Sequence, residues 1–366
     1  MERPWYRSFN WALVAAAVAV SALGIVAIRS AGLRNPAGSG EWTKQLAYVV
    51  AGLGLMGAFA AFDYMKLKRY ALALYVANFL LLAIVMRGGH SALGAVRWIS
   101  LGPLGTFQPS EPAKLILAIV VATLLARKGT VESREILIAI GAVTLPSLLI
   151  LKQPDLGTTL VVFAILSAEL FFGVTKMWHF GVYAACVALA GAFTVGTNFV
   201  LKPFQRSRLL VFLHPDSDPL GAGYNLNQSK IAVGSGELFG KGLHHGTQTQ
   251  LHFVPENSRD FIFTVVGEEL GHIGAVTLVA LYALLLGSAL RAVVAARDRF
   301  GVLLSVGLVA MLAFHVVVNI GMTIGIMPIT GIPLPFMSYG GSAVLTDYIA
   351  LGILLNIDLQ RDKLVF

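Results

Sequence analysis

The sequence predicts an all-α protein of about ten membrane-spanning helices. Of its 366 residues, 57% are hydrophobic and only 13% are charged, whereas soluble domains carry about 25% charged residues. Apolar runs of the length that crosses a hydrocarbon core of about 30 Å recur along the chain. No repeat of about 20–50 residues is visible, which argues against a repeat array. We therefore expect one transmembrane domain over residues 1–366.

Ten apolar runs meet the length of a transmembrane helix, roughly 17 to 25 residues. Arg3 and Arg7 precede the first run as in a signal peptide, but no small-residue cleavage site follows, so an uncleaved first helix is expected. Only Lys152–Asp155 separates the fifth run from the sixth. The ten runs cover residues 9–28, 45–63, 69–87, 110–127, 135–151, 156–174, 178–200, 261–290, 300–327 and 341–358.

The distribution of basic residues predicts the orientation. If the N-terminus is cytoplasmic, the inner segments hold fourteen Lys and Arg residues and the short outer segments hold seven. The remaining six lie in the loop 201–260, which is discounted because long loops cross largely regardless of charge. Both termini are therefore expected in the cytoplasm, and 201–260 becomes a large extracytoplasmic loop between helices seven and eight. Basic flanks and anionic headgroups also explain the net charge of +8, so no nucleic-acid partner is expected.

Several classes of protein are disfavoured by missing motifs. The single cysteine, Cys186, excludes an intrachain disulfide. The sequence has no HExxH or CxxC metal spacing, no P-loop and no GxSxG nucleophile elbow. These absences argue against a zinc protease, an ATP-driven pump and a serine hydrolase.

Asp260 is the leading candidate for a functional residue. It lies where the long polar loop enters the eighth apolar run, and ionisable groups at membrane depth usually serve a function. The alternative is that Asp260 caps the helix N-terminus, a position that aspartate favours. Glu268 and Glu269 follow about 12 Å deeper. At least one of them needs a buried partner, and an ion pair or a headgroup contact is expected.

Two further acids lie at expected helix starts on the same side. Ser110 is a candidate N-cap for the fourth helix, and Glu111 and Lys114 share a face three residues apart. This pair either closes the helix end or faces a substrate. Asp155 is expected to cap the sixth helix.

Other polar groups recur on the expected outer side. Arg97, Arg206 and Arg208 offer guanidinium groups that suit bidentate phosphate contacts or lipid headgroups. The loop 201–260 is either a solvated loop with glycine turns or part of a binding site. Its candidate binding residues are Gln228, Ser229, Lys230, His245 and Gln248. His315 and Asp347 lie within apolar helices, as a buried pair or a proton relay.

Seven ordered motifs between residues 97 and 345 closely resemble the SEDS family of bacterial peptidoglycan polymerases. The segments QSKIAVGSG and GKGLHHGTQTQ look like the rod-shape-determining branch of that family rather than its division branch. The motifs are QPSEPAKL, KQPDLGTT, DPLGAGYNLNQSKIAVGSGELFGKG, HGTQTQ, FVPENSRDFIF, EELG and GIPLPFMSYGGSA.

The resemblance implies a ten-helix fold and polymerisation of lipid II outside the bacterial cytoplasmic membrane during cell elongation. It also implies a class B penicillin-binding protein as partner, together with other membrane proteins of the elongation complex. The essential aspartate of the family corresponds to Asp260, its Glu–Lys pair to Glu111 and Lys114, and its Gln-Pro-Asp aspartate to Asp155.

The chain departs from the family just before Asp260. Ser258 and Arg259 stand where the family commonly has His-Thr, so neither side chain is expected to be chemically essential.

Glycan polymerisation would use these groups in a simple way. Asp260 would act as general base on the attacking sugar hydroxyl, and attack opposite the leaving group would invert the anomeric centre. Arg206, Lys114, Arg97 or a divalent cation, Mg²⁺ or Mn²⁺, would neutralise the departing pyrophosphate. The alternative function is a flippase for lipid-linked precursor, which would place its binding groups near the midplane. A non-enzymatic scaffold would not explain the acids and bases.

The orientation can be tested by cysteine labelling. In a background without Cys186, single cysteines in 201–260 should react with an impermeant thiol reagent in intact cells, because that loop is expected outside. Cysteines in the 291–299 connection should stay protected. The reverse pattern would overturn the orientation.

Overall fold

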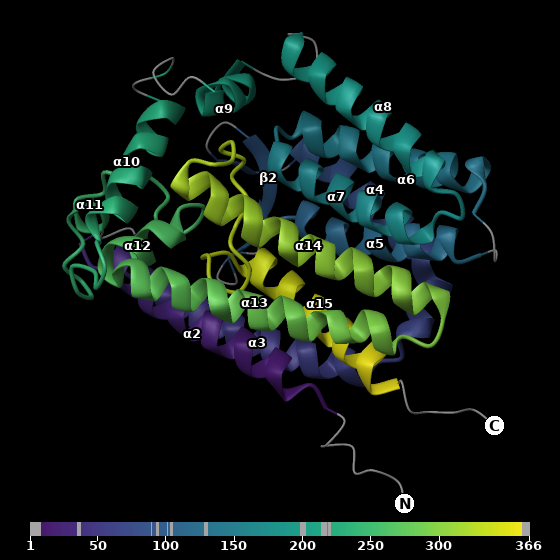
Figure 1. The fold of residues 1–366 in the computed structure, drawn as a ribbon, viewed down its shortest axis with the longest axis horizontal. Coiled ribbons are helices and arrows are strands. Elements are labelled where there is room, and N and C mark those ends of the chain that lie inside the picture. The colour runs from purple at the N-terminus through teal and green to yellow at the C-terminus, as the bar shows by residue number, and fades with distance from the viewer. Residues whose placement is uncertain are drawn as a thin grey trace, which may run out of the picture.

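The computed structural model describes residues 9–34, 38–88, 90–92, 95–100, 102, 105–127, 131–197, 203–213, 218 and 221–360. The fold is nearly all-helical, as the sequence predicts (Figure 1). Within these residues, nine helices are long and apolar enough to cross a membrane. They are α2 (Trp11–Gly32), α3 (Glu41–Ala61), α4 (Tyr64–Gly88), α6 (Ser133–Lys152), α7 (Leu156–Gly173), α8 (Met177–Gly196), α13 (Gly271–Ala295), α14 (Arg299–Ile324) and α15 (Gly341–Leu359).

The expected helix at 110–127 is shorter than predicted and lies inside the bundle. It forms α5 (Ser110–Leu125), which has 16 residues, most of them buried. Ser110 at its start contacts Asp155 before α7, and Leu125 at its end packs against Gly173 in the last turn of α7. Helix α5 therefore runs the full length of α7, which is itself a spanning helix.

The prediction of a single helix over 261–290 is wrong, because the structure has two helices there. Helix α12 (Ile262–Glu269) is buried along its whole length, and α13 begins at Gly271. Gly271 has φ +66°, a left-handed conformation that favours glycine and ends α12. The long loop then caps α13, since the N–H groups of its second and third residues donate to the carbonyls of Glu237 and Leu238 at 2.9 and 3.2 Å.

A small antiparallel sheet interrupts the otherwise helical fold. Its strands follow the order β1 (His90–Ala92), β2 (Ala95–Ser100) and β3 (Thr106–Phe107). The expectation of an all-α chain missed this sheet, because strands of two to six residues are too short to show a clear alternating pattern. The loop 201–260 also carries short helices: α9 (Pro203–Leu213), α10 (Ala222–Ser235) and α11 (Thr247–Gln250).

The start of α2 and the end of α15 lie at the same end of the bundle, opposite α10–α12 (Figure 1). Polar contacts at that end join helices far apart in sequence. Asn10 donates to the carbonyl of Ser288 at 2.9 Å, and Arg291 lies 3.9 Å from Asp358. This arrangement is the one that an even number of crossings produces.

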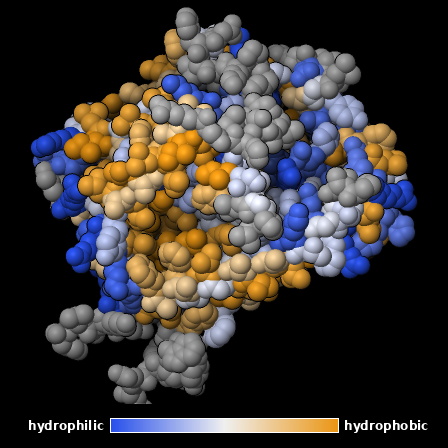
Figure 2. Space-filling model, turned by 180° about the vertical axis from the view of Figure 1, so that it is seen from behind, coloured by the Kyte–Doolittle hydropathy of each residue, from blue (hydrophilic) through white to orange (hydrophobic). Residues whose placement is uncertain are grey.

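The surface is that of a multi-pass membrane protein. Apolar residues cover a broad area of the face in Figure 2 and are flanked by hydrophilic residues. Helix α8 shows the same property, because Tyr183 is its one buried residue. An apolar surface of this extent needs lipid or another apolar partner around it.

The junction between α10 and α12 should be sensitive to a single methyl group. A Cβ at Gly236 would overlap the backbone oxygen of Gly267, whereas a Cβ at Gly234 would meet nothing within 4 Å. We expect Gly236→Ala to destabilise the purified protein by about 1–3 kcal/mol through overpacking. Gly234→Ala, in the last turn of α10 and two residues before Gly236, should be neutral or stabilising. Thermal unfolding in detergent measures both, and equal effects would contradict the close packing.

Candidate active site

The backbone that carries Asp260 is held by three consecutive hydrogen bonds. The carbonyl groups of residues 258, 259 and 260 each accept one bond from an element far away in sequence. Tyr339 N donates to Ser258 O at 2.9 Å, Ser338 Oγ to Arg259 O at 2.6 Å, and Asn319 Nδ2 to Asp260 O at 2.8 Å. We call these three bonds the backbone clasp.

The donors of the clasp are themselves fixed. Asn319 on α14 also donates to the carbonyl of Ile332 at 2.7 Å, and Ser338 Oγ accepts the N–H of Leu334 at 2.8 Å. Tyr282 on α13 donates to the carbonyl of Pro335 at 2.7 Å. The segment between α14 and α15 is thus anchored to neighbouring helices. The motif GIPLPFMSYGGSA lies in this segment, but the sequence alone does not indicate its role.

Asp260 does not cap a helix. The N-cap of α12 is Phe261, and no side chain forms a capping bond there. The capping interpretation is therefore wrong. The carboxylate instead lies beside Gly331, where a Cβ would be 3.2 Å from Asp260 Oδ2 and 3.5 Å from Arg208 Nη1. The sequence predicts Arg208 as a guanidinium on the outer side but does not indicate that it lies beside Asp260.

The pKa of the Asp260 carboxyl is raised to about 6, and burial is the largest cause. The negative charge of Glu256 also raises the pKa, while Arg208, Arg259 and Arg97 lower it. A carboxyl with a pKa near 6 is mostly ionised at neutral pH and still accepts a proton well. A pKa near the working pH is the property that suits a general base.

Asp155 caps α7, as the sequence predicts. Its Oδ1 accepts the N–H of Thr158 at 3.1 Å, and Arg97 Nη1 lies 3.9 Å away. Arg97 also donates to the carbonyl groups of Gln153, at 2.7 Å, and Pro154. The Gln-Pro-Asp turn therefore fixes Arg97, and the positive charge of Arg97 lowers the pKa of Asp260.

Ser110 is not the N-cap of α5, which is Pro109. The hydroxyl of Ser110 donates to Asp155 at 3.2 Å and is committed to that neighbour.

Glu111 and Lys114 form the expected pair, but deep inside the bundle. Lys114 Nζ lies 2.8 Å from Glu111 Oε2 and 3.2 Å from His315 Nε2, and Lys114 is only 1% exposed. His315 thus pairs with Lys114 rather than with Asp347, which is buried on α15. In this conformation the ammonium group of Lys114 is enclosed by its partners, so its contact with a substrate stays a prediction.

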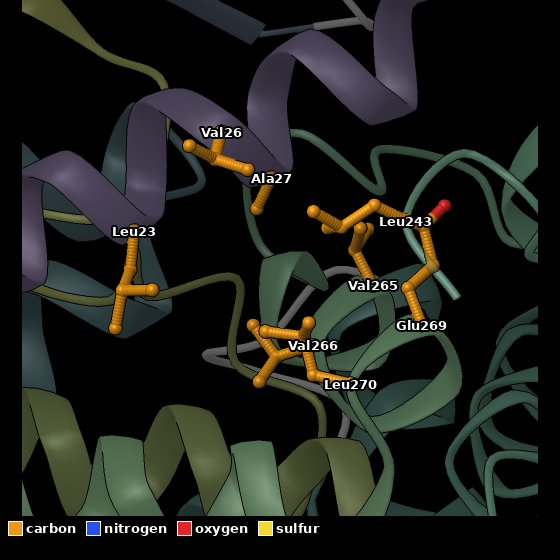
Figure 3. A pocket seen from close by; sticks show the side chains of 8 residues that line it. All are labelled: Leu23, Val26, Ala27, Leu243, Val265, Val266, Glu269 and Leu270. Atoms are coloured by element: carbon orange, nitrogen blue, oxygen red, sulfur yellow. The ribbon is translucent and has the colours of Figure 1, made fainter. Parts of the chain in front are cut away.

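Glu268 and Glu269 have structural roles, and Glu268 forms the expected ion pair. Lys241 Nζ and the N–H of Gln248 each lie 2.8 Å from Glu268 Oε1. Burial raises the pKa of Glu268, but these partners outweigh it and the net shift is downward. Glu269 accepts from Ser30 Oγ at 2.7 Å. Figure 3 shows Glu269 among apolar side chains of α2 and α12, which line a cavity of about 20 Å³.

The remaining predicted loop residues lie mainly on α10 and around α11. Ser229 is buried and donates to the carbonyl of Thr323 at 2.6 Å, which is a packing role. Lys230 is exposed beside Gly325, and His245 is exposed. Gln228 on α10 and Arg206 on α9 are half-buried. The structure does not bring these residues into the backbone clasp.

A divalent cation stays a prediction. Among the residues that the structure describes, no group of three His, Cys, Asp or Glu side chains could hold a metal ion. A bound diphosphate would supply oxygen ligands of the kind that Mg²⁺ and Mn²⁺ prefer.

Comparison with known proteins gives consistent matches over nearly the whole chain. Residues 10–363 match the cell cycle protein family of FtsW, RodA and SpoVE. Peptidoglycan glycosyltransferase MrdB of Escherichia coli K12 is 40% identical over 89% of this chain and 87% of its own length. Peptidoglycan glycosyltransferase RodA of Treponema pallidum is 32% identical, over 96% of this chain and 98% of its own length.

Solved structures show the same fold. RodA of Thermus thermophilus is 30% identical, with a TM-score of 0.72, and the match covers 98% of this chain and 100% of that one. A second match has a TM-score of 0.83 and 32% identity, covering 97% of this chain and 99% of that one. It comes from work on the "structural coordination of polymerization and crosslinking by a peptidoglycan synthase complex".

The raised pKa of Asp260 predicts that this residue lowers the stability of the fold at neutral pH. Because the folded pKa of about 6 exceeds the ordinary 3.8, the folded state binds the proton more tightly. That contribution to stability is present below the ordinary pKa and is lost as the pH rises through 6. Asp260→Asn should therefore be more stable than the native protein at pH 7.5, by about 1–3 kcal/mol.

The difference between the two proteins should shrink as the pH approaches 4. Thermal unfolding across this pH range tests it. Equal stability of the two proteins at pH 7.5 would contradict the raised pKa.

Proposed function

Because the chain belongs to the cell cycle protein family of FtsW, RodA and SpoVE, the SEDS family, we propose that it polymerises lipid II into glycan strands with Asp260 as general base. The chain is a peptidoglycan glycosyltransferase. One observation supports Asp260 as the base. The backbone clasp holds this residue beside arginine side chains, and the pKa of its carboxyl group is raised to about 6.

The proposed reaction joins two sugars. The 4-hydroxyl oxygen of the acceptor attacks the anomeric carbon of the donor, and the bond from that carbon to the lipid pyrophosphate breaks. Asp260 takes the hydroxyl proton as the new bond forms, which is typically worth about 10²–10⁴ in rate. A single attack opposite the leaving group inverts the anomeric centre.

Positive charge close to Asp260 supports departure of the pyrophosphate. Arg208 and Arg97 both act electrostatically on the carboxyl group, and Arg97 is fixed by the Gln-Pro-Asp turn. We propose that Arg97 and Arg208 neutralise the negative charge of the leaving pyrophosphate. Arg206, on the same helix as Arg208, would assist them. Lys114 would join them only if its enclosed ammonium group were uncovered. A divalent cation, Mg²⁺ or Mn²⁺, would supply further charge on the diphosphate.

A flippase is the less favoured function. The Asp260 site lies at one end of the bundle, where the loop 201–260 meets the segment between α14 and α15. Transporters usually bind substrate near the midplane. A site at the end of the bundle suits a lipid-anchored substrate whose polar head is at the surface.

We further propose a location and partners. The protein would lie in the bacterial cytoplasmic membrane with both termini inside and the loop 201–260 outside, as the basic residues favour. The match to a complex that coordinates polymerisation and crosslinking supports a class B penicillin-binding protein as partner, alongside other proteins of the elongation complex.

Substitution of Asp260 tests the proposed base. Asparagine keeps the shape of the side chain but cannot take the proton, so Asp260→Asn should fold normally and polymerise at least about a hundredfold more slowly. The native rate should fall as the pH drops through about 6, because the base becomes protonated. Polymerisation of fluorescent lipid II by purified protein measures both. Near-native synthesis by the asparagine variant would remove Asp260 from the mechanism.

A further inference from the structure

Arg259 combines a fixed backbone with a weakly held side chain. Its carbonyl oxygen accepts the hydroxyl of Ser338 at 2.6 Å, within the backbone clasp. Its side chain is 45% exposed, and its charge acts on the neighbouring Asp260. A guanidinium group is thus presented at the site from a fixed point on the chain.

The partners of the Arg259 guanidinium are two carboxylates, each reached by a single nitrogen atom. Nη1 lies 3.3 Å from Glu256 Oε2, and Nη2 lies 3.8 Å from Glu41 Oε1. Glu256 is itself 39% exposed. Ion pairs of this kind contribute only about 0–1 kcal/mol. The ring of Tyr339, 5.7 Å from the guanidinium carbon, adds a contact that does not use the N–H donors.

The other arginines near Asp260 are committed to protein partners. Arg97 donates to two backbone carbonyls of the Gln-Pro-Asp turn. Arg208 lies against Gly331 and Asp260, and burial lowers its pKa. Arg259 differs from both, because its donors face carboxylates that another anion can replace at little cost. A phosphate matches the guanidinium fork at two points and carries more charge than either carboxylate.

We propose that Arg259 binds a phosphate of the lipid-linked donor by exchanging Glu41 and Glu256 for that phosphate. This role deepens the proposed function and rests on it. The two glutamates hold the guanidinium in place while the site is empty, and they compete with the substrate for it. Arg259 thereby sets donor affinity in this chain, while Asp260 carries the proton transfer.

If the glutamates compete with the substrate phosphate, substituting Arg259 and substituting a glutamate should have opposite effects on the KM. Arg259→Gln should raise the KM for lipid II about ten- to a hundredfold, the value of one charge-assisted contact, and change kcat by less than about threefold. Glu41→Gln and Glu256→Gln should each lower that KM. The assays belong at pH 8, where Asp260 is ionised, because Glu256 also raises the pKa of Asp260.

A matched control is available at the other end of the molecule. Arg291 is 46% exposed, much like Arg259, and pairs at 3.9 Å with a carboxylate, that of the buried Asp358. Arg291→Gln should leave the KM unchanged. If the glutamate variants raise the KM or leave it unchanged, the contacts of Arg259 are structural and the proposal is overturned.

Binding measured without turnover separates this inference from the proposed function. A polyprenyl diphosphate should stabilise the native protein against heat more than the corresponding polyprenyl alcohol does. Arg259→Gln should lose the diphosphate-specific part of that stabilisation. If native protein fails to polymerise lipid II, the proposed function fails. If it polymerises and Arg259→Gln keeps the full diphosphate response, only the role of Arg259 fails.

Discussion

The backbone clasp on residues 258–260 is the constraint on which the site depends. The three carbonyl oxygens follow one another in the chain, and each accepts a hydrogen bond from a residue far away in the sequence. Asn319 supplies one from a transmembrane helix, and Ser338 and Tyr339 supply two from the segment before α15. Because all three donors are fixed, the carboxyl of Asp260 has a defined position without any helix cap.

The clasp explains why charge can be adjusted around Asp260 without moving it. Buried backbone groups must be hydrogen-bonded, and the clasp meets that requirement without using the carboxyl group of Asp260. The pKa of the carboxyl group is set by its surroundings. Burial and Glu256 raise it, and three arginines lower it. Arg97 and Arg208 are fixed, whereas Arg259 can change partners. Position and electrostatics are thus controlled by separate groups.

The loop 201–260 is structural as well as functional. Its residues 237 and 238 cap α13, and its Lys241 and Gln248 satisfy the buried Glu268. Without these partners, a buried carboxylate and the N–H groups at the start of a membrane helix would be left unpaired, at a cost of several kcal/mol. This pairing explains why glycines are needed where the loop packs closely against α12 and Gly271.

The sequence alone determined the membrane class, nearly all the membrane-spanning helices, the Asp155 cap and the Glu111–Lys114 pair, because these depend on apolar length and on residues close together in the chain. It also singled out Asp260 from its position at a membrane boundary. Only the tertiary structure decided that Asp260 is clasped rather than capping, that the eighth span breaks at Gly271, and that Arg208 is the α9 guanidinium beside Asp260. The clasp and the placement of Arg208 depend on Asn319, Ser338 and Gly331, which lie about 60 to 80 positions away from Asp260 along the chain and become its neighbours only through helix packing.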